Sequence, residues 1–440
     1  MESLVREPVA RTGGPATVLT DDQIRDFVHT ELEGLALEGR DVCLLVPDAT
    51  RTCPLPALVT ALHGALHGRA RRLTVLVALG THQPMGEEAL AAHLGYTPGR
   101  LADRYPGLEV RNHEWWDPAA LVTVGRIPAG RVAELSGGRL GGEVTVRVNR
   151  AVVDHDVTMI VGPVFPHEVV GFSGGNKYLF PGVSGPELID VSHWLGALIT
   201  SAEIIGTPGT TPVRALIDEA AALVPSRRLA LCVVTAAGGG LHSAALGRPE
   251  DAWAAAAEVS ARTHVRYLDS PVGTVLSVLA PRYADLWTGA KGFYKVEPVV
   301  ADGGQVVIYA PHLTEISVTH PGIRDIGYHC RDYFVKQWGR FEDRPWGELA
   351  HSTHLRGAGT WDPVGGEQAR VRVTLATGIP EDVVRAVNLD YLDPGRVDVA
   401  AWSARPDTLV VPDAGEDLYR LRPDRHPGGY TLGEPRKGDA

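Results

Sequence analysis

Residues 41–84 decide the fold, and they read DVCLLVPDATRTCPLPALVTALHGALHGRARRLTVLVALGTHQP. Two short apolar runs, DVCLLVP and RLTVLVAL, each stop at a polar turn. Between these runs, LPALVTALHGALHGRA places apolar residues at the three-to-four spacing of a helix. This strand, helix, strand order predicts a parallel β-sheet covered by helices, with ligands bound where the strands end.

The flanking residues extend this pattern. On the N-terminal side, residues 21–40 combine acidic residues at the start with helical apolar spacing, which predicts a helix ending near Gly39. Residues 1–20 are a polar lead containing Pro and Gly, and we expect them to be loose. Further along, residues 157–177, VTMIVGPVFPHEVVGFSGGNK, predict a third strand that ends in a polar turn.

A second α/β block starts near residue 264. Residues 264–312 again have a strand, helix, strand pattern, and apolar runs at 371–379 and 407–415 add two further strands. We therefore predict an α/β protein of two domains with mostly parallel sheets and an active-site cleft between them. The domains are residues 1–263 and residues 264–440, with the option that the last residues return to the first domain.

Composition excludes several classes of protein. The 440 residues are 44% hydrophobic and 22% charged, as in folded water-soluble proteins. A formal net charge of −11 argues against general nucleic-acid binding, and no apolar run is long enough to span a membrane. The four cysteines form no C-x-x-C motif, so neither a disulfide framework nor a zinc ribbon is indicated. We expect a cytoplasmic protein.

The turn PDATR, residues 47–51, places a carboxylate, a hydroxyl and a guanidinium directly after the first predicted strand. Asp48, Thr50 and Arg51 suit an anionic ligand because arginine presents a planar fork of donors. The alternative is that Asp48 or Thr50 caps the next helix and that Arg51 is an ordinary surface residue.

Two other strand ends carry candidate functional residues. His82 follows the second strand, in ALGTH, where it is either a catalytic imidazole or a structural histidine. In GFSGGNK, Ser173, Gly174 and Gly175 could cradle a phosphate through backbone N–H groups. The spacing of a Walker A loop is absent.

Taken together, these motifs resemble the nickel-pincer lactate racemase family of 2-hydroxy-acid racemases and epimerases. The resemblance rests on DATR, ALGTH, HEVVGFSGGNK, DVSHW and GAKG, which occur in this order over residues 48–292. Its most specific part is the spacing of His167, Lys177 and His193. These three residues match the family's second acid/base histidine, its cofactor-bearing lysine and its nickel-ligating histidine.

The resemblance implies a cofactor, a reaction and partners. Family members carry a nickel-pincer nucleotide, a pyridinium mononucleotide with two sulfur substituents that hold nickel, which would be linked covalently to Lys177. His193 would be the nickel ligand, and enzymes that assemble the cofactor would be partners. Hydride would pass from Cα of a 2-hydroxy acid to the ring and back. The remaining nucleotide contacts would come from Asp48, Thr50, Ser173, Gly174 and Gly175.

His82 and His167 match the family's pair of bases, one for each orientation of the substrate hydroxyl. Imidazole suits this role because it takes and returns a proton near neutral pH. Arg51 and Lys291 would clamp the substrate carboxylate. Thr288 stands where lactate racemases usually have Gln, so we expect a substrate other than simply lactate.

Two alternatives remain open at this point. One is a different hydride-transfer reaction, such as oxidation or reduction, with the same cofactor. The other is a non-catalytic two-lobed protein that binds a small anion.

Other polar or aromatic clusters are interpreted as structural. They comprise VDHDV at 153–157, NHEWWD at 112–117, HCRDY at 329–333, and the aromatic residues Trp287, Phe293 and Tyr294.

Overall fold

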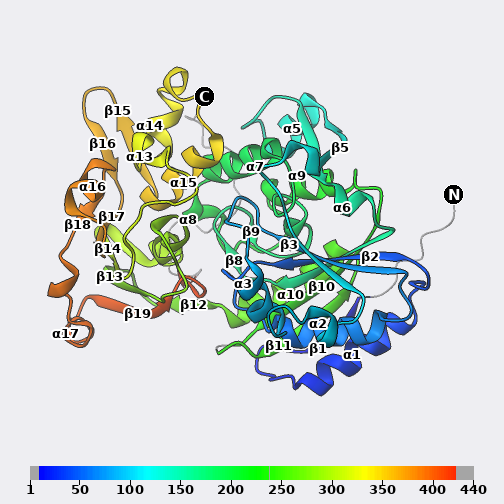
Figure 1. The fold of residues 1–440 in the computed structure, drawn as a ribbon. Helices are drawn as coiled ribbons and strands as arrows, with labels where there is room; N and C mark the ends of the chain where they lie inside the picture. Colours follow the sequence, from blue (N-terminus) through cyan, green and yellow to red (C-terminus); the bar gives the residue numbers. More distant parts are fainter. Residues whose placement is uncertain (1–8, 237, 423–440) are drawn as a thin grey trace. The chain divides into compact units, whose positions relative to one another are not determined.

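The computed structural model describes residues 9–236 and 238–422, and these residues form two compact units (Figure 1). The first unit comprises the chain to Phe165, Ser173–Ser192 and Pro208–Thr263. The second comprises Pro166–Phe172, His193–Thr207 and the chain from His264. The predicted boundary at residue 263 places Pro166–Phe172 and His193–Thr207 in the first domain, whereas these two segments belong to the second unit. The predicted return of the last residues falls largely on 423–440, outside the described residues.

The first unit is built on a seven-stranded sheet with the order β1-β11-β10-β7-β2-β3-β4. The strands from β10 to β4 pair in parallel, whereas β11 pairs antiparallel with β10 and β1. Their bounds are Ala10–Gly13 (β1), Asp41–Pro47 (β2), Arg72–Ala78 (β3), Leu108–Asn112 (β4), Val157–Pro163 (β7), Arg227–Thr235 (β10) and Leu241–Gly247 (β11).

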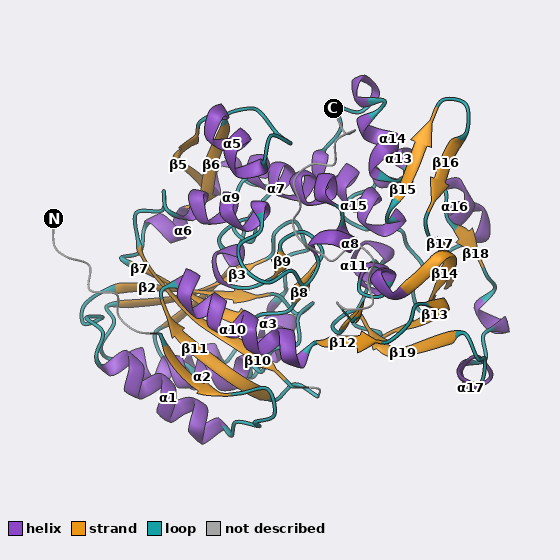
Figure 2. Ribbon diagram, turned by 180° about the vertical axis from the view of Figure 1, so that it is seen from behind, coloured by secondary structure: helices purple, strands orange, loops and turns teal. Residues whose placement is uncertain are grey.

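Both faces of this sheet are buried, as expected for a parallel sheet between helices. Leu44 and Leu45 are neighbours on β2 and point to opposite faces, yet neither is exposed to solvent. Helices α1, α2 and α3 contribute to the core on one face, and α10 packs against β10 and β11 (Figure 2). Their bounds are Asp21–Glu33 (α1), Leu55–Leu66 (α2), Glu87–Leu94 (α3) and Pro249–Thr263 (α10).

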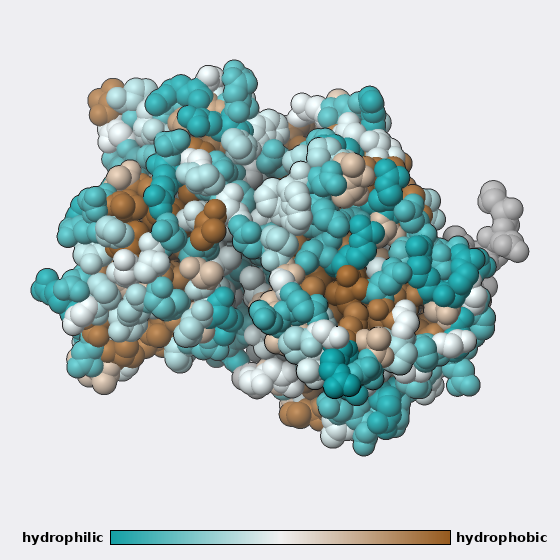
Figure 3. Space-filling view, viewed as in Figure 1, coloured by the Kyte–Doolittle hydropathy of each residue, from teal (hydrophilic) through white to brown (hydrophobic). Residues whose placement is uncertain are grey.

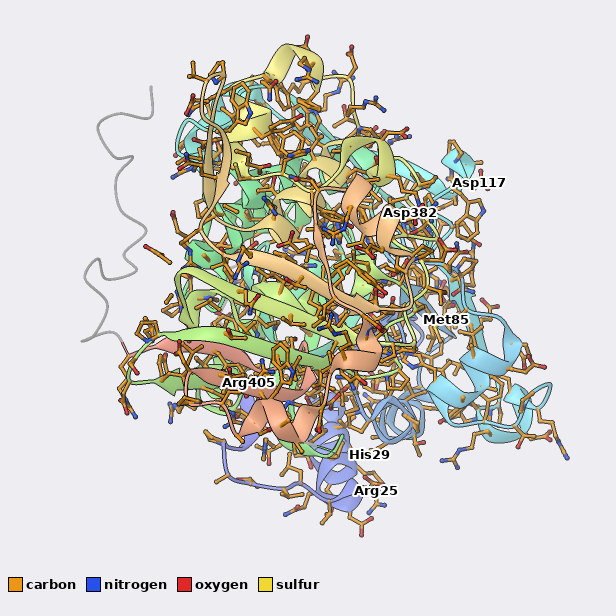
Figure 4. The ribbon with its side chains drawn as sticks, turned by 90° about the vertical axis from the view of Figure 1, so that its left-hand side faces the viewer. Arg25, His29, Met85, Asp117, Asp382 and Arg405 are labelled. Carbon is orange, nitrogen blue, oxygen red and sulfur yellow. The ribbon has the colours of Figure 1, made fainter. Side chains whose placement is uncertain are left out.

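Helix α1 illustrates how the sequence sets an element. Thr20 and Gln23 form a reciprocal capping box, in which each side chain accepts a hydrogen bond from the other residue's N–H. Val28 lies on the buried face, whereas the exposed Arg25 points outward in Figure 4. The predicted helix over 21–40 is therefore present but ends earlier, at Glu33.

The remaining elements of the first unit are short. They are α4 (Leu101–Arg104), η1 (Pro118–Ala120), the antiparallel pair β5 (Leu121–Ile127) and β6 (Val144–Asn149), α5 (Ala129–Ser136), α6 (Arg150–Val153), η2 (Gly175–Tyr178) and α9 (Pro212–Ala221). Helix α7 (Pro186–Ile199) contributes residues to both units, with the division between Ser192 and His193.

The second unit is built on a five-stranded sheet with the order β18-β17-β14-β13-β19, in which every pair is parallel. Its strands are β13 (Val272–Leu279), β14 (Val300–Ala310), β17 (Arg372–Thr377), β18 (Asp390–Tyr391) and β19 (Thr408–Ala414). Three small pairs accompany it: β8 (Pro166–His167) with β9 (Gly171–Phe172), β12 (Val265–Leu268) with β20 (Leu418–Leu421), and β15 (Gly359–Asp362) with β16 (Gly366–Ala369).

The helices of the second unit are mostly single turns. They are α8 (Ser201–Ile204), α11 (Leu286–Gly289), α12 (Lys291–Tyr294), η3 (Glu297–Val299), α13 (Ile323–Ile326), α14 (Arg331–Val335), η4 (Trp338–Arg340), α15 (Trp346–Arg356), α16 (Glu381–Ala386), η5 (Pro394–Arg396) and α17 (Val399–Ser403).

The predicted α/β fold with mostly parallel sheets is confirmed. The expected loose lead was wrong for residues 10–13, which form β1 at the sheet edge. All four cysteines are free. Within residues 9–236 and 238–422, no helix combines the length and hydrophobicity needed to cross a bilayer. On the face seen in Figure 3, hydrophilic residues predominate and hydrophobic ones form small patches.

Candidate active site

Asp48 and His82 follow two neighbouring parallel strands of the first unit. Strands β2 and β3 pair Pro47 with Ala78, so the turns after them leave the same edge of the sheet. There, Oδ2 of Asp48 lies 2.5 Å from Nδ1 of His82. The fold thus brings together two polar residues that the sequence places on separate turns.

The carboxylate of Asp48 is held on its other side by Thr50. Its Oδ1 accepts hydrogen bonds from the Thr50 hydroxyl at 2.7 Å and the Thr50 N–H at 3.1 Å. Burial by itself would raise the pKa of Asp48, but His82, the Thr50 hydrogen bonds and the charge of Arg51 outweigh it. The pKa of this carboxyl is therefore held well below its usual range, and Asp48 is ionised at neutral pH.

The alternative role of Asp48 and Thr50 as helix caps is wrong. Helix α2 starts at Leu55, and its cap position is Pro54, which provides no side-chain hydrogen bond. The two residues instead bond to each other and to His82.

The backbone of His82 is fixed as well. Its N–H donates to the carbonyl of Leu79 at 2.9 Å, and its own carbonyl accepts the indole N–H of Trp115 at 3.0 Å. The side chain retains 30% of its exposure. His82 is thus anchored at one ring nitrogen and at its backbone while remaining open to solvent.

The glycine-rich loop that begins at Ser173 is packed against the protein itself. Gly174 has a φ of +83°, and a Cβ there would lie 2.5 Å from Cγ2 of Val164. Gly175 has a φ of +57°, and its Cβ would lie 2.9 Å from Cβ of Trp253. Packing alone therefore requires both glycines. Ser173 is buried, and its hydroxyl accepts the N–H of Phe165.

Lys177 directly follows Asn176, whose side chain is held by three hydrogen-bond partners. Asn176 is buried, and its amide nitrogen donates to Asp218 and Glu250, each at 2.9 Å. Its amide oxygen accepts a hydrogen bond from Arg228 at 3.0 Å. Lys177 itself is half-buried. The neighbouring network fixes the backbone from which this amine extends.

In the second unit, His167 lies on β8 and is 3% exposed. Its Nδ1 accepts the N–H of Val169 at 3.1 Å. A carboxylate oxygen of Glu168 lies 3.3 Å from the same nitrogen.

His193 belongs to the same unit and lies on α7, where it is half-buried. One turn later, Gly196 packs so closely against Val169 that a Cβ would lie 2.9 Å from its Cγ1. The helix that carries His193 therefore packs against the hairpin that carries His167.

Thr288 and Lys291 lie on the single-turn helices α11 and α12. The hydroxyl of Thr288 donates to Oδ1 of Asp285 at 2.9 Å, and Asp285 also caps α11 through the Thr288 N–H. Lys291 is 6% exposed, with its Nζ 5.4 Å from the centre of the Tyr283 ring. The hydroxyl proton of Thr288 is thus engaged within the protein.

The aromatic residues around Thr288 pack as predicted. Phe293 and Tyr294 are buried in the hydrophobic core of the second unit. Trp287 is stacked between the rings of His320 and His351, with centroid distances of 4.0 and 3.9 Å.

Comparisons of the sequence and the fold with known proteins lead to one family. The family model for the lactate racemase N-terminal domain matches residues 21–205. A Thermotoga maritima protein of known crystal structure is 33% identical, with a TM-score of 0.85, over 93% of this chain and 100% of that chain. The chain belongs to the lactate racemase family. The structure of the lactate racemase apoprotein from Thermoanaerobacterium thermosaccharolyticum shares the fold, with a TM-score of 0.68 at 18% identity, over 93% of this chain and all of that chain.

Two curated members of the lactate racemase family are also similar in sequence. The lactate racemase of Lactiplantibacillus plantarum is 27% identical over 180 residues, which are 40% of this chain and 36% of that protein. The lactate racemase of T. thermosaccharolyticum is 24% identical over 166 residues, or 37% of this chain and 34% of that protein. These matches span about a third of each curated relative.

The segment that matches the lactate racemase domain contains most of the predicted site. Only Thr288 and Lys291 lie outside residues 21–205. The individual roles of all the predicted site residues stay predictions.

Sequence reasoning missed a buried histidine on α15. His354 is 3% exposed, and its Nδ1 lies 2.6 Å from the hydroxyl of Ser201. Burial lowers the pKa of His354 to about 4; Glu168 opposes this shift and His193 adds to it. The only signal was the pair of histidines in HSTH, three positions apart on one helix.

The histidines of the other polar clusters have hydrogen-bond partners within the protein. His155 is buried and bonds to the carbonyl of Ala151 and the hydroxyl of Thr74, and His329 bonds to Glu367 at 2.8 Å. His113 is fully buried and contacts the Ser184 carbonyl. In the part of the chain that the structure describes, no three His, Cys, Asp or Glu side chains come together in a way that could hold a metal ion.

Proposed function

We propose that this member of the lactate racemase family is an isomerase that inverts the hydroxyl-bearing Cα of a 2-hydroxy acid. The observation that carries the proposal is the Asp48–His82 pair, which lies at a strand end within the segment matched by the family. An imidazole that is anchored by a carboxylate and remains partly exposed is suited to take a proton from a bound substrate.

His82 and His167 are the proposed bases. Removing the weakly acidic α-hydrogen as a proton would build a second negative charge beside the substrate carboxylate. Removing it as hydride while a base takes the hydroxyl proton gives a planar keto acid instead. The two enantiomers present the hydroxyl in different directions, so two bases are required.

Arg51 and Lys291 are the proposed clamp for the substrate carboxylate. Both side chains are permanent or strong cations, and the charge of Arg51 already contributes to the lowered pKa of Asp48. A carboxylate fixed in this way would hold Cα in a constant position for the reaction.

The residues present fit the cofactor that the family implies. Lys177 and His193 are half-buried, so neither lies in a hydrophobic core, and an imidazole is a suitable ligand for Ni(II). Lys177 would carry the nickel-pincer nucleotide covalently, and His193 would bind its nickel. When bound, the cofactor would accept the α-hydrogen as hydride and return it. The proposed contacts to the nucleotide are Thr50, Ser173, Gly174 and Gly175, whereas Asp48, which the resemblance also implied, is engaged by Thr50 and His82.

We propose a substrate other than simply lactate. Thr288 replaces the usual Gln, and its shorter side chain is tied to Asp285. A position that would hold an amide against the substrate thus holds a smaller group whose donor is already used. Cytoplasmic location, the cofactor-assembly partners and the cleft between two domains stay predictions.

The cofactor assignment is tested by producing the protein together with cofactor-assembly enzymes and measuring its intact mass and nickel content. We expect a covalent nucleotide adduct in the wild type and in the Lys336→Ala control, whose side chain is half exposed. Lys177→Ala should lack the adduct. An adduct that persists in Lys177→Ala would overturn the assignment.

The reaction is tested on the same preparation with a panel of 2-hydroxy acids and a chiral assay. Inversion of one or more of them supports the isomerase. Net formation of a keto acid without inversion would instead indicate an oxidoreductase, and binding without either reaction would indicate an anion-binding protein.

A further inference from the structure

We infer that Asp48 is a positioning residue, which fixes the neutral His82 ring with its proton on Nδ1 and leaves Nε2 as the proton-accepting atom. The assignment of the tautomer rests on the hydrogen-bond geometry and the ionised state of Asp48, while its catalytic consequence rests on the proposed function. It also gives Asp48 a role other than the nucleotide contact expected from the family.

The chemistry of the two bonded atoms decides which of them carries the proton. A carboxylate oxygen only accepts hydrogen bonds, and Oδ2 of Asp48 lies 2.5 Å from Nδ1 of His82. The burial and partners of Asp48 keep it ionised. Nδ1 must therefore be the donor, and in the neutral ring this leaves the lone pair on Nε2.

Neither Asp48 nor His82 can turn freely. Thr50 holds Oδ1 through its hydroxyl and its N–H, which fixes the orientation of the carboxylate. Trp115 and Leu79 hold the backbone of His82. Among the described residues, only Nδ1 of the His82 ring is hydrogen-bonded, so Nε2 remains available to a ligand.

The hydrogen bonds and burial of Asp48 distinguish this role from nucleotide binding. Both oxygens of Asp48 are already engaged within the protein, and the side chain keeps only 9% of its exposure. A carboxylate that bound a sugar hydroxyl would need an accessible oxygen. In the structure, the Asp48 carboxylate instead accepts hydrogen bonds from Thr50 and His82.

The direct test is nitrogen NMR of the protein with histidine selectively labelled with ¹⁵N, without cofactor and followed upward in pH until the His82 ring is neutral. The signals of His82 are identified by their loss in His82→Gln. We expect a protonated Nδ1 and an unprotonated Nε2 in the wild type. A proton on Nε2 in the wild type would overturn the inference, whether or not any variant folds.

Asp48→Asn should shift the His82 signals toward a mixture of the two tautomers. Its matched control is Asp41→Asn, since Asp41 is a buried carboxylate at the opposite end of the same strand and pairs with Arg71. The control should leave the His82 signals in place. Unchanged signals in Asp48→Asn would contradict the positioning role.

A second readout separates positioning from cofactor binding. In protein produced with the cofactor-assembly enzymes, Asp48→Asn should lower kcat about 10²-fold while adduct and nickel content stay at wild-type levels. A loss of adduct or nickel would show that Asp48 binds the nucleotide instead. If neither the wild type nor any variant turns over a substrate, the proposed function fails. The NMR experiment still tests the tautomer of His82 independently of turnover.

Discussion

His82 in the first unit and His167 in the second are proposed as partners in one reaction, yet different atoms hold them. At His82, Nδ1 donates to the carboxylate of Asp48. At His167, Nδ1 accepts the backbone N–H of Val169, so the proton of the neutral ring lies on Nε2. In the neutral rings, the lone pair therefore lies on Nε2 in His82 and on Nδ1 in His167.

Two histidines with the same expected role can therefore differ in which ring nitrogen carries the proton before substrate binds. His82 is ready to accept a proton at Nε2. The Nδ1 lone pair of His167 already accepts the Val169 N–H, so its Nε2 can accept a proton only after Nδ1 releases that N–H. His113 supplies a third case, in which Asn149 and the Ser184 carbonyl occupy both ring nitrogens.

The largest expected effect comes from replacing either proposed base. His82→Gln and His167→Gln should each lower turnover by about 10²- to 10⁴-fold, because general acid–base catalysis contributes that much. Nickel and adduct content should remain at the wild-type level. Loss of nickel in both variants would reassign the two histidines to structure and end the comparison.

His113, which both of its ring partners hold in place, predicts a pH dependence of the unfolding free energy. Burial lowers the pKa of His113 from its ordinary value of 6.5 to about 4. Between these values the unfolded chain binds a proton that the folded protein does not, so stability falls as the pH falls. The expected loss from pH 7 to pH 4 is about 3 kcal/mol for this group.

His113→Gln should remove this part of the pH dependence and leave turnover of the folded protein unchanged. Urea denaturation at several pH values measures the first effect. An equally steep pH dependence in the variant would show that His113 is not the group responsible.

The loop that follows the His167 hairpin gives the next prediction. Gly174→Ala should destabilise the protein by about 2–3 kcal/mol, because it combines a left-handed backbone with a 2.5 Å approach to Val164. Gly209 is the matched control, with a φ of +78° and open space around it. Gly209→Ala should cost about 1 kcal/mol. Equal costs in thermal or urea unfolding would contradict the packing argument.

The smallest expected effect concerns the support of Asp48. Thr50→Val removes the hydroxyl that donates to Oδ1 but retains the backbone N–H bond. We expect a loss of about 1 kcal/mol in unfolding free energy. Turnover should fall less than in Asp48→Asn. A larger loss of turnover would mean that the Thr50 hydroxyl itself contacts the substrate or cofactor.

Much of the fold could be predicted because its signals are local. The apolar runs that became β2 and β3, and the helical period between them, are readable from single stretches of sequence. Strand β1 was missed because it has only four residues and is stabilised by pairing with β11, more than 200 positions away. The same limit applies to residues 166–172 and 193–207, whose place in the second unit depends on distant contacts.

The candidate site was predictable to a similar degree. The strand-end rule placed Asp48 and His82 at one edge of a sheet, but the hydrogen bond between them depends on side-chain geometry that spacing does not encode. The glycines in the loop suggested close approach to a ligand, whereas in the structure Val164 and Trp253 occupy the positions that their side chains would fill. Family resemblance added the roles of Lys177 and His193, which local chemistry alone did not indicate.

The most direct test of the account follows the α-hydrogen of a 2-hydroxy acid that the cofactor-loaded protein inverts. The substrate is labelled with deuterium at Cα, and the reaction is run in ordinary water. Hydride transfer with proton exchange confined to the hydroxyl predicts that the inverted product keeps deuterium at Cα. Replacement of the label by solvent hydrogen at the rate of inversion would contradict the account, because the bases would then act on carbon.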